Sequence, residues 1–489
     1  MPDNLIIETT SGKVAGKRER GVRQWLGIEY AVAERFGLPE AVAAWDGVRD
    51  AKEFAPQVPQ GMGKRFMFDR PDFCEAGSLA LNIWAPEEPG PHPVFFWIHG
   101  GAFVAGGSNM YEGDEFAREH GIVVVGINYR LGALGFAAFG EALGIPSIAT
   151  NIGLRDQIAA LEWVRDNIKA FGGDPRRVTI AGESAGSMSV SLLMVSPKAR
   201  GLFHGAILQS GALNLIQDRA TAHRLARRYA ELLGLDQGSL EMLKSLPLAD
   251  LFRAQQQVGE EEKGGLPAAP FWDDDLLPES LAVAEQADHA PVPVIAGSNA
   301  EESRLFEWIA KDILPLERSA ISAILRAQLP SAADAEAILT CYPDNIKGNR
   351  ALATDLTFAM STRHFAEDHA AAGYAAWAYR FDWRQWLFGA AHAMDMLFLF
   401  PFRNPMKPLI LGGPMWGGRA ALARTMKNHW AHFIRQGCPR DDWPPYTPSD
   451  RKVMLLNTQS RIATNPDAER VNAWKGRIVA PRIGSHSTN

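Results

Sequence analysis

Residues 177–187 read Arg177-Val178-Thr179-Ile180-Ala181-Gly182-Glu183-Ser184-Ala185-Gly186-Ser187. The β-branched run before Gly182 predicts a buried strand, and residues 187–194 predict a helix directly after the turn. A strand, a Gly-x-Ser-x-Gly turn and a helix form the context that a nucleophile elbow requires. Such a turn strains the backbone of Ser184, so Gly182 and Gly186 must lack side chains where strand and helix pass close by. The alternative interpretation is an ordinary Gly-Ser turn.

Other short apolar runs have the length of strands buried on both faces. They cover residues 94–98, 122–127, 178–181, 206–208 and 292–296. Residues 151–170, between the second and third runs, keep a helical spacing of apolar side chains and end before Gly172 and Gly173. Alternating strands and helices predict a parallel sheet. We find no repeat or long linker, so we expect a single domain over residues 1–489.

Composition excludes several classes of protein. The hydrophobic share of 46% and the charged share of 22% are typical of a globular protein. The net charge is -6 and there is no basic block, which argues against nucleic acid as a partner. No apolar run reaches the roughly 18 residues of a membrane span, and residues 1–16 lack a signal-peptide pattern. The few, widely spaced cysteines Cys74, Cys341 and Cys438 fit a reducing compartment, so we expect a cytoplasmic protein.

A glycine-rich loop follows the first of these strands. Residues 94–98 run into His99-Gly100-Gly101-Ala102-Phe103, as expected of a loop that holds a developing oxyanion. The expected amide donors are Gly101, Ala102 and Ala185. The alternative is a glycine-rich turn without a chemical role. We expect His99 to hold this loop by a hydrogen bond and not to act as a base.

In an elbow enzyme the acid follows the nucleophile and the histidine comes last. Two adjacent carboxylates, Glu301 and Glu302, follow the strand at 292–296, and one of them could be a solvated residue at a helix start. His392 follows a predicted strand at 375–381, and the small residues around it leave room for its ring. The rival histidines, His429 and His432, lie in residues 424–435, which we predict to be a surface or interface helix.

With these residues placed, the chain resembles the type-B carboxylesterases, which include bacterial para-nitrobenzyl esterases, mammalian liver carboxylesterases and cholinesterases. The resemblance covers nearly the whole chain. Its motifs are Gly27-Ile28-Glu29-Tyr30-Ala31, Trp45-Asp46-Gly47-Val48-Arg49-Asp50-Ala51, Leu79-Ala80-Leu81-Asn82-Ile83-Trp84, His99-Gly100-Gly101-Ala102-Phe103, Asn128-Tyr129-Arg130, Gly153-Leu154-Arg155-Asp156-Gln157, Phe171-Gly172-Gly173-Asp174-Pro175 and Gly182-Glu183-Ser184-Ala185-Gly186.

The resemblance implies an α/β-hydrolase fold: a mostly parallel central sheet flanked by helices, with inserted helical segments over the active site. It implies Ser184 as nucleophile, His392 as base and Glu302 as acid, because Gly297 and Phe306 fix the register of the acid loop. It places the oxyanion donors on Gly101, Ala102 and Ala185. The family's supporting polar network falls on Glu183, Ser210 and Asp395, which are equally well interpreted as structural polar contacts.

Three departures from the family pattern limit what the resemblance implies. Val58 and Ser78 stand where the family's N-terminal disulfide would fall, so that loop is not covalently tied. Residues 61–76 hold Phe66, Phe68 and Phe73 but no tryptophan to bind a quaternary ammonium, so choline esters are not expected substrates. Ser303 replaces the glycine usually found after the acid.

We therefore expect a serine carboxylesterase that hydrolyses esters of small to medium apolar or aromatic alcohols or acids through an acyl-enzyme on Ser184. No cofactor or metal is expected, since neither a zinc-ligand spacing nor a phosphate loop is present. Carbamates, amides and lactones remain alternative substrates, and a non-catalytic binding protein is an alternative of another class. We expect no partner beyond the small-molecule substrate, no membrane association, and either a monomer or a homodimer. Several aromatic side chains lie near the motifs, and each either lines an apolar pocket or belongs to the hydrophobic core: Phe103, Phe271, Trp272, Trp308, Trp386 and Phe388.

Overall fold

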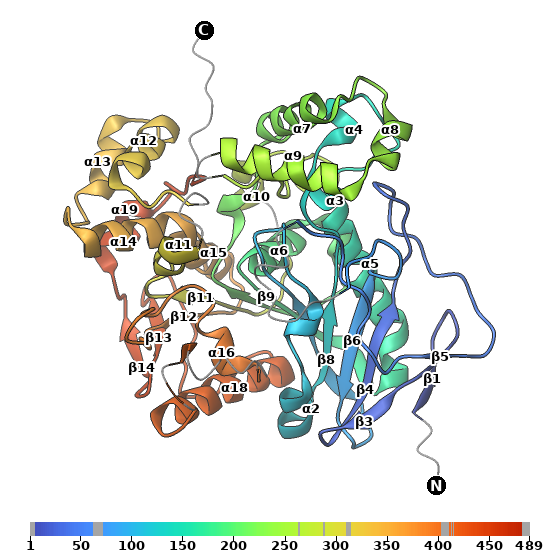
Figure 1. Ribbon diagram of the computed structural model, residues 1–489. Helices are drawn as coiled ribbons and strands as arrows, with labels where there is room; N and C mark the ends of the chain where they lie inside the picture. Colours follow the sequence, from blue (N-terminus) through green and yellow to red (C-terminus); the bar gives the residue numbers. More distant parts are fainter. Residues whose placement is uncertain are drawn as a thin grey trace.

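The computed structural model describes residues 5–61, 72–262, 265–286, 289–309, 314–401, 410–411, 413 and 415–481. Its centre is an 11-stranded sheet in the order β14-β13-β12-β11-β10-β9-β7-β8-β6-β4-β3, shown in Figure 1. The strands of this sheet are β3 (Lys17–Glu19), β4 (Val22–Glu29), β6 (Ala80–Ala85), β7 (His92–Ile98), β8 (Val123–Ile127), β9 (Gly173–Glu183), β10 (Gly205–Gln209), β11 (Val294–Asn299), β12 (Ala376–Phe381), β13 (Lys452–Leu456) and β14 (Arg461–Thr464).

Parallel pairing joins the central strands, as the alternating pattern of strands and helices predicted; in order these are β8, β7, β9, β10, β11, β12 and β13. Antiparallel pairs close both edges, β6, β4 and β3 on one side and β14 on the other. A separate three-stranded sheet, which we did not predict, consists of β1 (Ile6–Glu8), β2 (Lys13–Ala15) and β5 (Val48–Asp50). The main sheet is mostly parallel, as expected.

Each central strand is buried on both faces. Val94, Phe96 and Ile98 of β7 pack into one hydrophobic cluster, whereas Phe95 and Trp97 pack into another on the opposite face. The first cluster receives α5 (Ile152–Asn167), α6 (Ala185–Val195) and α15 (Met360–Ala371). The second receives α2 (Asp114–His120), α16 (Met396–Leu399) and α18 (Gly418–Gln436). Helices thus flank the sheet on both sides.

Residues 424–435 form part of α18, as predicted. One face of this helix, with Met426, Trp430 and Phe433, is buried against the sheet and α16, whereas Arg424 is exposed. The indole N–H of Trp430 also donates to the side-chain oxygen of Gln209. A role of α18 as an interface remains a prediction.

Two further helical groups have small cores of their own, and both lie toward the top of Figure 1. The first contains α3 (Gly132–Phe136), α4 (Phe139–Ala142), α7 (Arg219–Leu233), α8 (Leu240–Ser245) and α9 (Leu248–Glu261). The second contains α12 (Arg318–Gln328), α13 (Ala332–Leu339), α14 (Ile346–Thr354) and α19 (Ala468–Trp474). These groups are the inserted helical segments expected of the fold.

The remaining short elements are α10 (Leu281–Gln286), α11 (Ser303–Ile309), η1 (Ser108–Met110), η2 (Ile168–Phe171), η3 (Pro197–Ala199), η4 (Leu213–Leu215) and η5 (Asp355–Ala359). None of the helices in the described ranges is long and apolar enough to cross a membrane. The single-domain assignment remains a prediction.

Candidate active site

Ser184 sits at a strained turn between β9 and α6. Its backbone angles are φ 58° and ψ -124°, a conformation that L-residues rarely adopt. A methyl group on Gly182 would lie 2.4 Å from the carbonyl carbon of Gly186, and one on Gly186 would lie 2.1 Å from the carbonyl oxygen of Ile98. Both glycines are therefore required by close backbone approach, as predicted. Ser184 is partly exposed, whereas residues 181–183 and 185–195 are buried.

The glycine-rich loop after β7 lies against this turn. A methyl group on Gly100 would come 3.1 Å from the Cβ atom of Ser184. Gly101, Ala102 and Phe103 all have positive φ values, of 115°, 55° and 58°. Among the described residues, no acceptor is recorded for the backbone N–H groups of Gly101, Ala102 or Ala185. The role of these three amides as oxyanion donors remains a prediction.

His99 holds the glycine-rich loop by a hydrogen bond and does not lie where a catalytic base would. Its ring is fully buried, stacks on Tyr129 with centroids 4.5 Å apart, and its Nδ1 lies 2.8 Å from the carbonyl oxygen of Gly100. Burial lowers the pKa of His99 to about 4, so the ring is neutral and Nδ1–H is the donor. The predicted structural hydrogen bond is confirmed.

The loops after β11 and β12 bring Glu302 and His392 together. Glu302 Oε2 lies 2.7 Å from His392 Nδ1, and both side chains are buried. The other oxygen of Glu302 accepts the backbone N–H of Asn299 at 2.6 Å. Both carboxylate oxygens therefore face donors, which keeps the proton on Nδ1 and leaves Nε2 as the nitrogen that can accept one.

Glu301 points elsewhere. Its carboxylate contacts Arg304 at 3.4 Å and Arg384 at 3.3 Å, and it accepts the backbone N–H of Ala390 at 3.1 Å. Its side chain is 25% exposed, against 0% for Glu302. Of the two carboxylates that the sequence left open, only Glu302 reaches the histidine.

A second carboxylate faces the other side of the His392 ring. Glu183 Oε1 lies 3.2 Å from Nε2, and both groups are buried. Glu183 Oε1 makes no hydrogen bond within the described residues, so its contact with Nε2 is an electrostatic one. Burial raises the pKa of Glu183 to about 8, which favours its neutral form. Burial would lower the pKa of His392, but Glu183 and Glu302 outweigh it and raise that pKa to about 9.

No hydrogen bond is recorded between Ser184 Oγ and His392, although both residues are described. Hydrogen bonds of this kind are often long without substrate and tighten when it binds. Glu183 precedes Ser184 in the chain and contacts Nε2, so the nitrogen that would act as a base faces the elbow.

The structure describes all three residues predicted to form a supporting polar network. Asp395 is fully buried and accepts from Gln209 Nε2 at 2.8 Å, Tyr379 Oη at 3.2 Å and Asn299 Nδ2 at 3.2 Å. Burial raises the pKa of Asp395. Ser210 is buried as well, but its hydroxyl has no hydrogen-bond partner among the described residues. Gln209 is a partner of Asp395 that we did not predict, and the network role of Ser210 remains a prediction.

The six aromatic residues predicted near the site have different environments. Phe103 and Phe271 are fully buried and Trp272 nearly so, each within a hydrophobic cluster. Phe388 is half-buried, and Trp386 is 81% exposed on the surface. The side chain of Trp308 and the residues Phe66 and Phe68 lie outside the described part of the structure. A pocket role for these aromatics remains a prediction.

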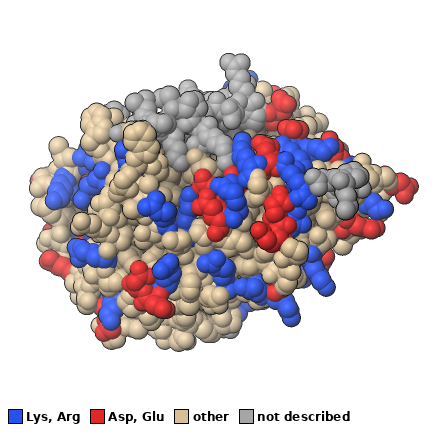
Figure 2. Space-filling model, turned by 90° about the horizontal axis from the view of Figure 1, so that it is seen from below, with Lys and Arg blue, Asp and Glu red and all other residues tan. Residues whose placement is uncertain are grey.

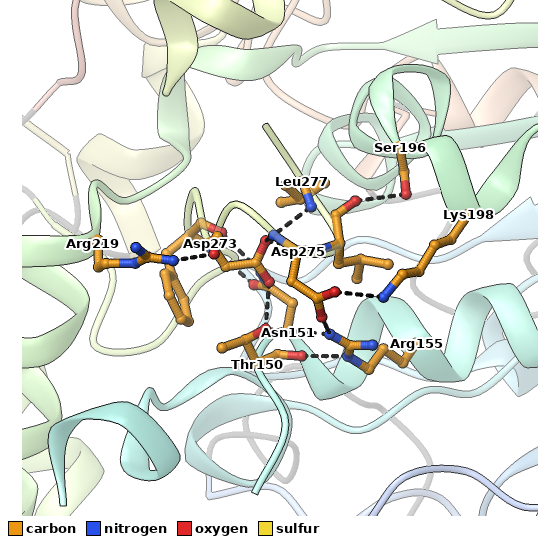
Figure 3. Close-up of polar contacts among 11 residues, drawn as sticks. Thr150, Asn151, Arg155, Ser196, Lys198, Arg219, Asp273, Asp275 and Leu277 are labelled. Atoms are coloured by element: carbon orange, nitrogen blue, oxygen red, sulfur yellow. Dashed lines mark hydrogen bonds and ion pairs between the residues drawn. The ribbon is translucent and has the colours of Figure 1, made fainter. Parts of the chain in front are cut away.

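The loop that carries Phe271 and Trp272 is fixed by a buried carboxylate, Asp273, which lies at the centre of the network in Figure 3. One oxygen of Asp273 accepts the backbone N–H groups of Asp275, Leu276 and Leu277 at 2.9 to 3.2 Å. The other accepts from Thr150 Oγ1 and from Asn151 Nδ2, the latter at 2.8 Å. Arg155 and Lys198 pair with Asp275, so the cluster is internally neutralised. We interpret it as a structural joint between the loop, α5 and η3.

The rival histidines are engaged away from the site. His429 is buried in α18 with its ring 5.2 Å from that of Trp443, and His432 Nδ1 lies 2.7 Å from the carbonyl oxygen of Cys438. In the described ranges, no group of three or more His, Cys, Asp or Glu side chains is arranged to hold a metal ion.

The sequence did not reveal several residues around His392. Phe358 stacks on its ring with centroids 4.4 Å apart, and Phe306 lies at 5.2 Å. Asn299 joins the two loops, since its Nδ2 also donates to the carbonyl oxygen of Ala391 at 2.8 Å. Of these residues, only Asn299 could have been found from the sequence, because it stands at the carboxyl end of a strand shortly before the acid. Phe358 lies in a helix with no local pattern.

The chain is similar over nearly its whole length to known esterases. The model of the carboxylesterase family matches residues 3–474. Para-nitrobenzyl esterase of Bacillus subtilis (strain 168) is 33% identical, with 95% of this chain and 97% of that protein covered. Carboxylesterase 4A of Bos taurus is 31% identical, with 96% and 94% covered.

Solved structures give the same result. A PNB esterase superimposes with a TM-score of 0.88 at 32% identity, with 96% of this chain and 99% of that chain covered. A carboxylesterase of Geobacillus stearothermophilus gives a TM-score of 0.82 at 32% identity, with 96% and 100% covered. The chain belongs to the carboxylesterase family, with its α/β-hydrolase fold, and is a carboxylic-ester hydrolase.

Proposed function

We propose that ester hydrolysis proceeds through an acyl-enzyme on Ser184, with His392 as general base and Glu302 as the acid that orients it. The observations that carry the proposal are the buried 2.7 Å contact between Glu302 and His392 Nδ1 and the strained turn that holds Ser184 at φ 58°. A nucleophile, a base and an orienting carboxylate are the three parts that this chemistry needs.

In the first half-reaction His392 Nε2 takes the proton of the Ser184 hydroxyl while Oγ bonds to the ester carbonyl carbon. The carbonyl oxygen becomes negatively charged and is bound by the N–H groups of Gly101, Ala102 and Ala185. When the C–O bond to the alcohol breaks, the imidazolium returns its proton to the departing alkoxide.

In the second half-reaction water replaces the alcohol. His392 takes a proton from the water, whose oxygen bonds to the acyl carbon. The bond to Ser184 Oγ then breaks, and the imidazolium protonates the serine. The products are a carboxylic acid and the free enzyme.

Glu183 supports the base electrostatically. Its carboxyl oxygen lies 3.2 Å from Nε2, so the ionised form of Glu183 stabilises the imidazolium that forms in each half-reaction.

The proposed substrates are esters of small to medium apolar or aromatic alcohols or acids. The aromatic rings of Phe306 and Phe358 beside His392 support this class, as does the name of the para-nitrobenzyl esterase relative. A small-molecule partner agrees with Figure 2, where basic and acidic side chains are interspersed over the face shown. The three unpaired cysteines support a cytoplasmic location, which cell fractionation would test.

The test is a pair of matched serine variants assayed on p-nitrophenyl and naphthyl esters of rising chain length, with carbamates included. Ser184→Ala should lower kcat by at least about a thousandfold. Ser191→Ala is the control, because Ser191 lies buried in α6, the helix that follows Ser184, and its hydroxyl donates to the carbonyl oxygen of Met188. Near-parental turnover by folded Ser184→Ala would exclude the mechanism, and faster turnover of carbamates than of every ester would change the substrate class.

A further inference from the structure

The helix that runs from Ile346 to Ala371 contains a single widened turn. Residues of α14 and α15 are α-helical, but η5 (Asp355–Ala359) between them is a π-helical turn. Such turns are rare, and they occur often at functional sites because they rotate side chains out of the regular helical array. Phe358 belongs to this turn.

Among the described residues, Phe358 has the ring packed most closely on His392. Their centroids lie 4.4 Å apart and their planes are inclined by 24°, a stacked arrangement. Phe306 also contacts the imidazole, at 5.2 Å and 44°. Phe358 is only 2% exposed, so its ring has no freedom to leave the stack without repacking the core.

The π turn is bonded to the nucleophile side of the site. Asn214, itself buried, donates from Nδ2 to the carbonyl oxygens of Leu356 and Thr357, each at 3.0 Å. Thr362 Oγ1 donates to the carbonyl oxygen of Phe358 at 2.8 Å and accepts the N–H of Gly211 at 3.0 Å.

Gly211 in turn lies directly beside the elbow. A methyl group on it would come 3.1 Å from the carbonyl oxygen of Ser184. Gly211, which lies close to the backbone of the elbow, is therefore linked through Thr362 to the backbone of Phe358.

The same helix is bonded to the acid loop. The N–H of Ser303, the residue after Glu302, donates to Thr354 Oγ1 at 3.2 Å, and Ser303 Oγ donates to the carbonyl oxygen of Arg350 at 3.0 Å. Ser303 is the residue that departs from the family's usual glycine. Its hydroxyl contributes a bond that glycine would lack, so the acid loop is tied to the beginning of the π turn.

We propose that the π turn and Phe358 form a positioning element for His392, which fixes the plane of the imidazole between the acid loop and the elbow. This inference rests on the proposed function of His392. Phe358 acts in two ways: its ring blocks rotation of the imidazole, and its negatively polarised face stabilises the imidazolium formed during each half-reaction.

Phe358→Leu tests the inference, because leucine keeps the apolar surroundings but removes the aromatic face. We expect kcat for p-nitrophenyl acetate to fall about tenfold to a hundredfold, while KM changes by less than about threefold. The acid limb of the pH profile of kcat/KM should move to lower pH, since the imidazolium loses stabilisation. The carboxylates that face His392, those of Glu183, Glu302 and Asp395, are unchanged in this variant. Phe358→Tyr, which retains the face, should restore most of kcat and the parental profile.

Phe365→Leu is the matched control. Phe365 lies in the same helix, is buried, and stacks on another histidine, His289, with centroids 5.1 Å apart. It should alter neither kcat nor the pH profile. Thr362→Val breaks the link between Gly211 and Phe358 with little change of shape. It should lower kcat by a smaller factor than Phe358→Leu, and it serves as the test if Phe358→Leu does not fold.

Two results would overturn the inference while leaving the proposed function intact. One is a Phe358→Leu enzyme that matches Phe365→Leu in kcat and pH profile, and the other is a change in KM alone, which would make Phe358 a wall of the substrate pocket. Substantial activity in folded His392→Gln would instead show that the proposed function itself is wrong.

Discussion

Replacing Glu302 by glutamine should disable the enzyme without unfolding it. The two oxygens of Glu302 face two donors, His392 Nδ1–H at 2.7 Å and the N–H of Asn299 at 2.6 Å. A glutamine has only one acceptor oxygen. If that oxygen keeps the Asn299 bond, the amide NH2 faces Nδ1 and drives the proton to Nε2, so the histidine can no longer take the serine proton.

The size of the effect follows from the lost charge. A carboxylate and an imidazolium about 4 Å apart attract each other by about 4 kcal/mol at an effective dielectric constant of about 20. Since each 1.4 kcal/mol or so changes a rate tenfold, kcat should fall by about a thousandfold. Steady-state kinetics on p-nitrophenyl acetate would measure the fall, and thermal unfolding should show a melting temperature close to the parent.

Glu301→Gln is the matched control, because Glu301 is the adjacent carboxylate and contacts Arg304, Arg384 and the N–H of Ala390 instead of His392. It should lower kcat by no more than a few-fold, since an exposed ion pair contributes little. A severe defect in Glu301→Gln beside nearly normal Glu302→Gln would refute the assignment of the acid.

Three further predictions concern the surroundings of the site. Glu183→Gln removes a negative charge beside His392, so the pKa of that histidine should fall. The acid limb of kcat/KM, which lies above the ordinary histidine value of about 6.5 in the parent, should then move to lower pH, and an unchanged limb would show that the charge of Glu183 does not act on His392. Gly186→Ala places a methyl group 2.1 Å from the carbonyl oxygen of Ile98, so it should lower the free energy of unfolding by about 3 kcal/mol or more in urea. Gly259→Ala in α9 is the control, because the nearest atom to its methyl group lies at 3.6 Å. Equal stability of the two variants would contradict the close packing of the elbow. Asp273→Asn puts an amide where buried N–H donors need an acceptor, so the free energy of unfolding should fall by about 2 to 3 kcal/mol while kcat changes little. A variant as stable as the parent would show that this network does not stabilise the fold.

Much of the fold was predictable because its signals are local. The run before Gly182, the two glycines and the following helix specify a strained turn, and their close approach in the structure explains why no other residue fits there. The central strands were predictable because burial on both faces requires continuous apolar runs. The short strands β1, β2 and β5 carry exposed residues with no clear alternation, so nothing in the sequence indicated them.

The parts of the site that the sequence did not predict depend on contacts between distant segments. Gln209 and Ser210 are neighbours of similar polarity, and only the direction of the strand decides that Gln209 reaches Asp395. Phe358 meets His392 through a turn whose π-helical geometry has no sequence pattern.

The most direct test of the central claim is to find which residue an organophosphate ester labels. The reagent phosphylates an activated serine, and mass spectrometry of the digested protein identifies the modified peptide. The account predicts one label per chain, on Ser184, with activity lost in proportion to labelling, and no labelling of folded His392→Gln at the same reagent concentration. Stoichiometric labelling of another serine, or full activity with Ser184 modified, would contradict it.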